Sequence, residues 1–149
     1  MATPPVRVSP ADVDDEGMPE LLAAAVGGGW DRANRIVEQY RRDPELILLR
    51  ASIGTALVGV VGYTVKGTDV VVLHIATSED SRRSGVGRQM LQAVREATPN
   101  HFRLVAETDS DAVGFYIANG FLAESLGEKY PGVERFHVRT LASGLPPKN

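Results

Sequence analysis

Apolar residues recur at helical spacing in two stretches of the first third of the chain. These stretches predict helices over Pro19–Val26 and Trp30–Arg41. Gly27-Gly28-Gly29 separates the two helices, and we interpret it as a helix stop followed by a loop. Trp30 is the only tryptophan, and we expect it to be a packing anchor, with a substrate platform as the alternative.

Runs of β-branched and other apolar residues, bounded by turn residues, predict the strands of the first half. The expected strands are Val6–Val8, Glu45–Ala51, Ala56–Lys66 and Val70–Ala76. Ser9-Pro10, after the first of them, is typical of a turn or a helix cap. Gly67-Thr68-Asp69 predicts a hairpin turn, so the strands on its two sides should be antiparallel. Gly59 and Gly62 are expected to mark bulges or close packing.

A helix between two strands follows this hairpin. The helix is predicted over Gly85–Ala97, because apolar residues line one of its faces. These residues are Val86, Met90, Leu91 and Val94. The helix connects Val70–Ala76 to the next expected strand, His101–Thr108. A helical crossover of this kind predicts that the two strands are parallel.

The last third of the chain predicts a short helix and a pair of strands. The helix is expected over Asp111–Asn119, with Ser110 or Asp109 as its cap and Gly120 as its stop. The remaining elements are the strands Phe121–Leu126 and Val133–Thr140 and a polar loop at Gly127–Gly132. We therefore predict an α+β fold with a mixed, mostly antiparallel sheet flanked by helices. No repeat or linker divides the chain, so residues 1–149 are expected to form one domain, with an ordered core over residues 6–141 and loose tails at Met1–Pro5 and Ala142–Asn149.

Composition narrows the classes of function. The chain has 43% hydrophobic residues, enough for a packed core, and no cysteine, which excludes disulfides, thiolate metal sites and a cysteine nucleophile. Its three histidines, His74, His101 and His137, show no ligand spacing, so we expect no metal. A net charge of -3 disfavours nucleic acid as a partner and is compatible with a cationic amine. Neither a membrane-spanning stretch nor a secretion signal is visible, so we expect a cytoplasmic protein.

The stretch from Val70 to Leu91 passes from a strand through a polar turn into a helix, and this order is typical of an anion site. The first turn of a helix has unpaired N–H groups and the positive end of the helix dipole. The turn also holds glycines, which allow a ligand to approach the backbone closely. Arginines add charged donors to the same turn. These residues are Arg82, Arg83, Gly85, Gly87 and Arg88.

Two motifs in this order resemble those of the GNAT family, the Gcn5-related N-acetyltransferases. Arg82-x-x-Gly85-x-Gly87 is similar to the family's acetyl-CoA pyrophosphate loop. Ile75-Ala76-Thr77 is similar to its strand-end segment, in which Val is commoner than Thr at the third position. Ala112-x-x-Phe115-Tyr116-x-x-x-Gly120-Phe121 resembles its second motif. The resemblance covers roughly the second half of the chain and implies the specific GNAT topology, with a central β-α-β unit that binds acetyl-CoA.

The resemblance also implies which residues bind acetyl-CoA. The pantetheine arm would pair with backbone groups at the end of the strand Val70–Ala76, where a backbone N–H could also stabilise the oxyanion of the thioester. The pyrophosphate would lie on the following loop, with an ordinary helix N-terminus carrying solvated arginines as the alternative. The expected binding residues are Ile75, Ala76, Thr77, Arg82, Arg83, Ser84, Gly85, Val86, Gly87 and Arg88.

The resemblance makes Tyr116 the expected general acid, which donates a proton to the departing thiolate, with a buried core tyrosine as the alternative. The general base is less specified by the sequence. Glu107 is the first choice, acting directly or through a water, and His74 is the second, with a packed strand histidine as its alternative role. Asp109 stands where the family often has a cofactor-contacting Asn, and an ionised carboxylate cannot donate a hydrogen bond, so it could instead cap a helix.

We therefore expect an acetyl-CoA-dependent N-acetyltransferase that moves an acetyl group to a primary amine by direct attack. A non-catalytic acyl-CoA sensor is the main alternative, a longer acyl donor or a hydroxyl acceptor is the second, and a nucleotide phosphate binder is the weakest. The last two strands could support a homodimer. In the GNAT fold that the resemblance implies, the last loop borders the acceptor pocket. An acidic, aromatic rim there would suit a cationic acceptor, with a solvated turn as the alternative. The first two helices also lie at this pocket, so a mobile lip over it is the alternative for Gly27-Gly28-Gly29. The rim residues are Glu124, Glu128, Lys129, Tyr130 and Glu134.

Overall fold

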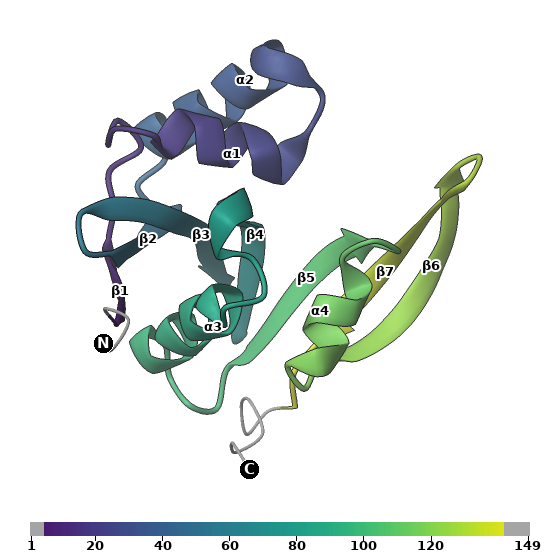
Figure 1. Cartoon of the computed structure of the whole chain (residues 1–149). Helices are drawn as coiled ribbons and strands as arrows, with labels where there is room; N and C mark the ends of the chain where they lie inside the picture. The colour runs from purple at the N-terminus through teal and green to yellow at the C-terminus, as the bar shows by residue number, and fades with distance from the viewer. Residues whose placement is uncertain (1–4, 142–149) are drawn as a thin grey trace. The chain divides into compact units, whose positions relative to one another are not determined.

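The computed structural model describes residues 5–141, so the tails expected at residues 1–4 and 142–149 lie outside the described residues. The strands and α-helices follow one another along the chain in the order that the sequence predicts (Figure 1). The elements are β1 (Val6–Pro10), α1 (Met18–Val26), α2 (Gly29–Arg42), β2 (Ile47–Ile53), β3 (Ala56–Lys66), β4 (Asp69–Thr77), a 3₁₀ turn η1 (Glu79–Ser81), α3 (Val86–Ala97), β5 (Arg103–Asp109), α4 (Val113–Ala118), β6 (Leu122–Tyr130) and β7 (Val133–Arg139).

The strands follow the order β1-β2-β3-β4-β5-β7-β6 in the sheet. β4 and β5 pair in parallel over Asp69–Val71, as the helical crossover between them predicts, whereas β1–β2, β2–β3, β5–β7 and β6–β7 are antiparallel. The predicted α+β class with a mixed, mostly antiparallel sheet is therefore confirmed. The chain forms two compact units. The first contains the residues up to Thr64 and His74–Val94, and the second contains Val65–Leu73 and the residues from Arg95 onward.

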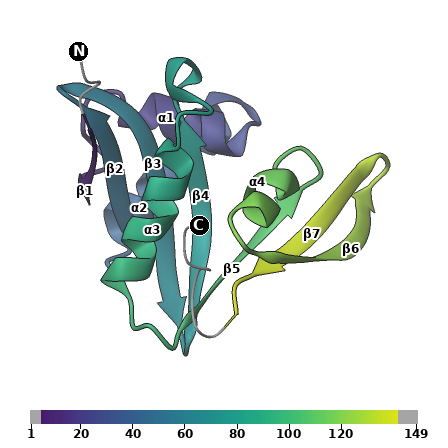
Figure 2. The same cartoon turned by 60° about the horizontal axis from the view of Figure 1, so that its bottom comes forward.

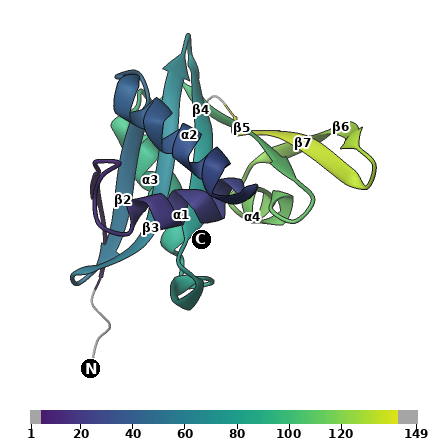
Figure 3. The ribbon, with the colours of Figure 1, turned by 90° about the horizontal axis from the view of Figure 1, so that it is seen from above.

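In the first unit, helices cover both faces of the strands. Residues of α1 and α2 form a buried cluster with Leu48 of β2 and Val60 of β3. Figure 3 shows α1 and α2 across this face of β2 and β3. The other face meets α3, whose apolar stripe is at most 1% exposed at each position (Figure 2). This stripe consists of Val86, Met90, Leu91 and Val94, as predicted.

Two glycines of β3 allow the helices to approach the strand from opposite faces. A Cβ at Gly59 would lie 2.9 Å from the sulfur of Met90 in α3. A Cβ at Gly62 would lie 1.8 Å from the hydroxyl oxygen of Tyr40 in α2. Both distances are too short for real contacts, so a side chain at either position would displace the facing helix residue. The prediction of close packing at these two glycines is confirmed.

The second unit packs α4 against the ladder of β5, β7 and β6. Tyr116 of α4 and Val138 of β7 are buried there. The hydroxyl of Thr140 accepts a hydrogen bond from the Leu104 N–H at 2.9 Å, and the Thr140 N–H donates to the Leu104 carbonyl at the same distance. Gly120 has φ 90° and ends the helix, as predicted, because this left-handed conformation is accessible to glycine.

The segment between α3 and β5 is fastened by a buried arginine of the second unit. The Arg95 side chain is only 6% exposed, and its guanidinium donates to the carbonyls of Pro99 and Phe102. Burial lowers the pKa of Arg95. A buried cation needs hydrogen-bond acceptors, and here the backbone carbonyls of Pro99 and Phe102 provide them. Arg95 therefore stabilises the turn that begins at Pro99.

The structure corrects three local predictions. Ser9 and Pro10 continue strand β1, opposite Arg50 and Leu49, instead of forming a turn or cap. Proline is tolerated there because β1 is an edge strand, where one N–H needs no ladder partner. Trp30 is 57% exposed, so its interpretation as a packing anchor is wrong. It lies in the first turn of α2, ahead of the buried residues of that helix.

The third correction concerns the polar loop expected at Gly127–Gly132. Strand β6 instead continues to Tyr130, and the turn begins only after it. Register shifts occur between Ser125 and Gly127 and between Glu128 and Tyr130, which are typical of bulges. All nine residues of β6 are exposed, so this strand has no apolar face that its sequence could reveal.

The close approach at Gly59 predicts the effect of adding one methyl group. We expect Gly59→Ala to destabilise the protein by about 1–3 kcal/mol, because the new Cβ overlaps the Met90 side chain. Gly114→Ala is the matched control: nothing lies within 4 Å of its Cβ position, and alanine is the better helix former, so stability should stay equal or rise by up to about 1 kcal/mol. Urea unfolding of both variants measures the difference. Equal midpoints for Gly59→Ala and the parent protein would contradict the close packing of α3 on β3.

Candidate active site

The turn between β4 and α3 is built from short local hydrogen bonds. The Ser81 N–H donates to the Ser78 carbonyl at 2.9 Å, and the Ser84 hydroxyl donates to the Ser81 carbonyl. The N–H of Ser78 donates in turn to the carbonyl of Val58 in β3 at 2.8 Å, which fixes the start of the turn on the first unit's strands. The loop is therefore a defined structure that projects from the end of β4.

Two residues of this turn have the left-handed conformation. Gly85 has φ 84°, and Arg83 has φ 65°, the only positive φ of a non-glycine residue among those described. An L residue is strained there, and such strain is concentrated at functional sites. The side chains of Arg82 and Arg83 are exposed in this turn.

Helix α3 begins directly after Gly85, with its N-terminal turn facing this loop. Its first recorded hydrogen bond runs from the Gln89 N–H to the Gly85 carbonyl at 3.0 Å. The N–H groups of Val86 and Gly87 precede that bond and belong to the turn whose donors a helix cannot pair internally. Val86 is buried at 1% exposure, so the helix end is anchored in the core while its N–H groups point along the axis. This arrangement suits an anion.

The end of β4 lies beside the same loop within the first unit. Ile75, Ala76 and Thr77 are all partly buried, and Ala76 packs against the core cluster of α1 and α2. The Arg82 Nε donates to the Thr77 carbonyl at 3.4 Å, a long hydrogen bond that connects the loop to the strand end. The structure therefore brings together, in one unit, the two segments for which the sequence predicts cofactor contacts.

His74 precedes this segment and has a defined partner. The Tyr40 hydroxyl of α2 lies 2.7 Å from His74 Nδ1, and the two rings meet edge to face with centroids 5.5 Å apart. Burial, with the positive charge of Arg32, lowers the pKa of His74 to about 4, so the imidazole is neutral at physiological pH. The side chain is thus a packed, hydrogen-bonded strand histidine, and it shares the α1–α2 face of β4 with Ala76, as strand alternation predicts.

Tyr116 belongs to the second unit and has a buried ring. It is 4% exposed and meets Phe115 and Phe121 edge to face, with centroids 5.2 and 5.1 Å away. Burial raises the pKa of Tyr116 to about 12, which keeps the phenol protonated. Within residues 5–141 its hydroxyl has no hydrogen-bond partner. Among the same residues, Arg95 Nε is the only side-chain nitrogen or oxygen that is both fully buried and without a partner, so the Tyr116 hydroxyl is not fully buried. The hydroxyl therefore keeps accessible surface.

Glu107 is exposed on β5 of the second unit. Lys129 Nζ lies 3.5 Å from its Oε1, and both side chains are about half exposed. His137 of β7 is the cross-strand partner of Glu107 on one side and of Glu124 in β6 on the other. Directly opposed residues share a face of a sheet, so the three side chains form one row. Sequence spacing missed this row because it arises only from strand pairing.

Asp109 has a local structural role. Its Oδ1 accepts hydrogen bonds at 3.0 Å from the N–H groups of Asp111 and Ala112, ahead of α4. The helix begins only at Val113, with Ala112 as its N-cap and no side-chain cap, so the prediction that Asp109 caps it is wrong: the carboxylate stabilises the turn before the helix instead. Tyr130, from the predicted aromatic rim, is 70% exposed near the tip of the β6–β7 hairpin.

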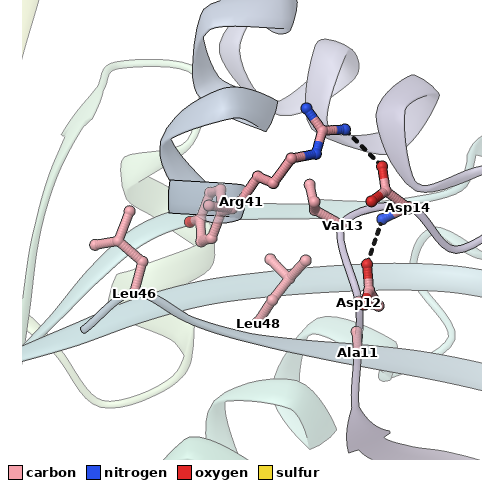
Figure 4. A pocket seen from close by; sticks show the side chains of 8 residues that line it. Ala11, Asp12, Val13, Asp14, Arg41, Leu46 and Leu48 are labelled. Atoms are coloured by element: carbon pink, nitrogen blue, oxygen red, sulfur yellow. Dashed lines mark hydrogen bonds and ion pairs between the residues drawn. The ribbon is translucent and has the colours of Figure 1, made fainter. Parts of the chain in front are cut away.

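A separate pocket of about 220 Å³ lies in the first unit near the start of β2 (Figure 4). Arg41 and Asp14 form an ion pair at 2.6 Å beside it, and this guanidinium holds the pKa of Asp14 below its usual value. Tyr40 belongs to the lining, but none of the predicted cofactor-binding or catalytic residues does. The lining residues are Ala11, Asp12, Val13, Asp14, Tyr40, Arg41, Leu46 and Leu48.

Metal-binding and membrane-spanning features are both missing from the part of the chain that the structure describes. No group of three or more His, Asp or Glu residues within residues 5–141 is placed to hold a metal ion. None of the helices described is long and apolar enough to cross a membrane.

Known proteins with the same architecture are numerous. An acetyltransferase from Thermus thermophilus superimposes with a TM-score of 0.73 at 20% identity, over 95% of this chain and 100% of that one. A GNAT family acetyltransferase from Elizabethkingia anophelis with acetyl-CoA bound gives 0.69 at 19% identity, over 91% and 97%. A Bacillus subtilis acetyltransferase in complex with CoA gives 0.70 at 19% identity, over 91% and 98%.

Sequence comparison is more specific than these similarities of fold. Comparison with curated protein sequences gives no significant match. The sequence model of the acetyltransferase (GNAT) domain, however, matches residues 45–122, which is more than half of the chain and includes β4, the Arg82–Arg88 loop and α3. The chain therefore belongs to the GNAT acetyltransferase family.

Proposed function

We propose that the protein is a cytoplasmic N-acetyltransferase that moves the acetyl group of acetyl-CoA to a primary amine. The main observation in support of the proposal is the geometry of the Arg82–Arg88 loop in a chain of the GNAT family. Its left-handed Arg83 and Gly85 lead into the N-terminus of α3, next to the end of β4. Helix N–H groups and exposed guanidinium groups fit a pyrophosphate, which carries negative charge and many acceptor oxygens.

The proposed binding residues are those of the strand end and the loop. The arm that bears the thioester would lie along the backbone of Ile75, Ala76 and Thr77, and a backbone N–H there would stabilise the developing oxyanion. Within the second unit, β4 pairs with β5 over Asp69–Val71, ahead of these three residues in the chain. The proposed pyrophosphate-binding residues are Arg82, Arg83, Ser84, Gly85, Val86, Gly87 and Arg88.

In the proposed reaction the amine nitrogen attacks the thioester carbon directly. A C–N bond forms, the C–S bond breaks, the sulfur gains a proton and the amine loses one. Acetyl-CoA supplies an acyl group that is already activated, so the protein mainly orients the reactants and moves protons. Tyr116 is the proposed proton donor to sulfur. Its raised pKa keeps the O–H in place, and its hydroxyl has accessible surface and no competing partner within residues 5–141.

Glu107 is the proposed base, acting directly or through a water. Its carboxylate is exposed, and its ion pair with Lys129 is long at 3.5 Å. An exposed pair of this kind contributes little stability, so a cationic amine can replace Lys129 at low cost. The negative charge of Glu124, two strands away in the same row, would then favour a cationic amine over a neutral or anionic acceptor.

The first test of the proposal combines binding with turnover. Calorimetric titration with acetyl-CoA and with CoA should give binding of both ligands, and a thiol-release screen over a panel of primary amines should give turnover with at least one. Binding without turnover would favour the acyl-CoA sensor instead. If neither ligand binds, the assignment of the Arg82–Arg88 loop is wrong.

Replacement of one glycine tests the loop itself. Nothing lies within 4 Å of a Cβ at Gly85, but its φ of 84° is strained for any L side chain. We expect Gly85→Ala to weaken CoA binding about tenfold, because the strain of roughly 1–2 kcal/mol changes the backbone that holds the phosphates. Gly114→Ala, on α4, should bind CoA like the parent protein. Titration calorimetry measures both, and unchanged affinity in Gly85→Ala would remove the loop from the site.

Tyr116→Phe tests the proton donor. The ring and its two aromatic contacts remain, so folding and CoA affinity should be unchanged. Loss of the hydroxyl should lower kcat about 100-fold, the usual scale for a general acid. Steady-state thiol release gives kcat, and calorimetry gives the Kd for CoA. A variant with full kcat would show that the hydroxyl has no part in catalysis.

A further inference from the structure

Tyr40 and His74 form a polar pair that the proposed reaction does not use. The hydroxyl of Tyr40 lies 2.7 Å from Nδ1 of His74, although the two residues are far apart in the sequence. Tyr40 is 9% exposed and belongs to the buried cluster of α1, α2 and β2–β3. His74 is only partly buried and immediately precedes the strand end Ile75–Thr77. The pair therefore connects the core to the candidate site within one unit.

Gly62 makes this contact possible. A Cβ at position 62 would lie 1.8 Å from the Tyr40 hydroxyl oxygen and 2.6 Å from Cζ. The phenol thus occupies the space of the missing side chain on β3. The backbone of Gly62 is not left-handed, so the approach of Tyr40, and not the backbone conformation, requires glycine here.

The chemistry of the pair fixes the direction of its hydrogen bond. A buried phenol O–H needs an acceptor, and an unsatisfied one is costly. Within residues 5–141 the only recorded partner of the Tyr40 hydroxyl is His74 Nδ1. The phenol therefore donates to Nδ1, and the imidazole carries its proton on Nε2. The lowered pKa of His74, caused by burial and by Arg32 of α2, agrees with a neutral ring in this tautomer.

We propose that Tyr40 is a positioning residue that fixes His74 as an Nε2–H hydrogen-bond donor to an oxygen of the acceptor substrate bound beside the end of β4. This inference rests on the proposed function. It names the acceptor class: a primary amine with a carbonyl or hydroxyl oxygen close to its nitrogen. The donor role also excludes His74 as the general base, because Nδ1 is occupied by the phenol and Nε2 has no free lone pair.

The tautomer can be measured without any substrate. Nitrogen-15 NMR of histidine-labelled protein at neutral pH should show His74 neutral, with Nδ1 unprotonated and Nε2 protonated. Tyr40→Phe and Gly62→Ala should change the Nδ1 resonance of His74 in the same way, since one removes the hydroxyl and the other displaces it. Tyr63→Phe removes a buried phenol from β3 and is the matched control, with an unchanged His74 signal. A proton on Nδ1, or no response to either variant, would overturn the inference.

Kinetics test the role of the donor. The thiol-release assay is run with pairs of amines that differ only in an oxygen near the nitrogen. The parent protein should favour the oxygen-bearing member about tenfold in kcat/KM, mainly through KM. His74→Ala should abolish this preference, and His74→Gln should restore part of it, because its amide can donate from near the Nε2 position.

The outcomes separate the inference from the proposed function. Turnover of both amines without a preference, or a preference that survives in His74→Ala, would overturn the inference alone. Absence of turnover with every amine would overturn the proposed function, and with it the acceptor assignment, even if NMR finds the Nε2–H tautomer.

Discussion

The N–H groups in the first turn of α3 cannot be paired by the helix itself, and the first unit holds them in a fixed place. Val86 and Met90 bury the start of the helix against β3, so the helix end cannot shift freely. Arg83 and Gly85 take left-handed conformations to bring the chain from β4 into that position. Strained backbone and helix N–H groups without an internal partner lie together here, and this combination supports the proposal that the loop binds a phosphate group.

Strand β3 allows this arrangement because it lacks side chains at two points. Gly59 admits Met90 from one face, and Gly62 admits Tyr40 from the other. The two helices that flank the strand therefore both approach it closely: α3 holds the end of the Arg82–Arg88 loop, and Tyr40 of α2 reaches His74. The packing against β3 thus positions His74 on β4 and the N-terminus of α3. A larger residue at Gly59 or Gly62 would disturb the candidate site, although neither glycine is part of that site.

The sequence predicts the elements whose pattern is local and misses those that depend on pairing. Strand β3 has the predicted bounds Ala56–Lys66, and the buried face of α3 is the predicted one, because strand and helix periodicities are strong there. Strand β6 was missed beyond Leu126, since bulges and exposure on both faces remove its alternation. The contact of Tyr40 with His74 and the cross-strand row at Glu107 join distant parts of the chain, which no spacing rule reveals. The roles of the individual site residues stay predictions.

Tyr116 and His74, the two groups proposed to donate hydrogen to the reactants, are both neutral near pH 7, and this constrains the proton path. Burial raises the pKa of Tyr116 to about 12, and burial with Arg32 lowers that of His74 to about 4, so neither changes charge near pH 7. Both can donate hydrogen bonds there, but neither is placed to accept a proton. The Tyr116 phenol is already protonated, and in the proposed tautomer of His74 the Tyr40 hydroxyl occupies Nδ1 while Nε2 carries its own proton. In the proposed reaction the proton would therefore leave through a carboxylate such as Glu107 or through water. In these proposals His74 would hold the acceptor by its oxygen and Tyr116 would protonate the sulfur, while an exposed acidic group would pass the amine proton to the solvent.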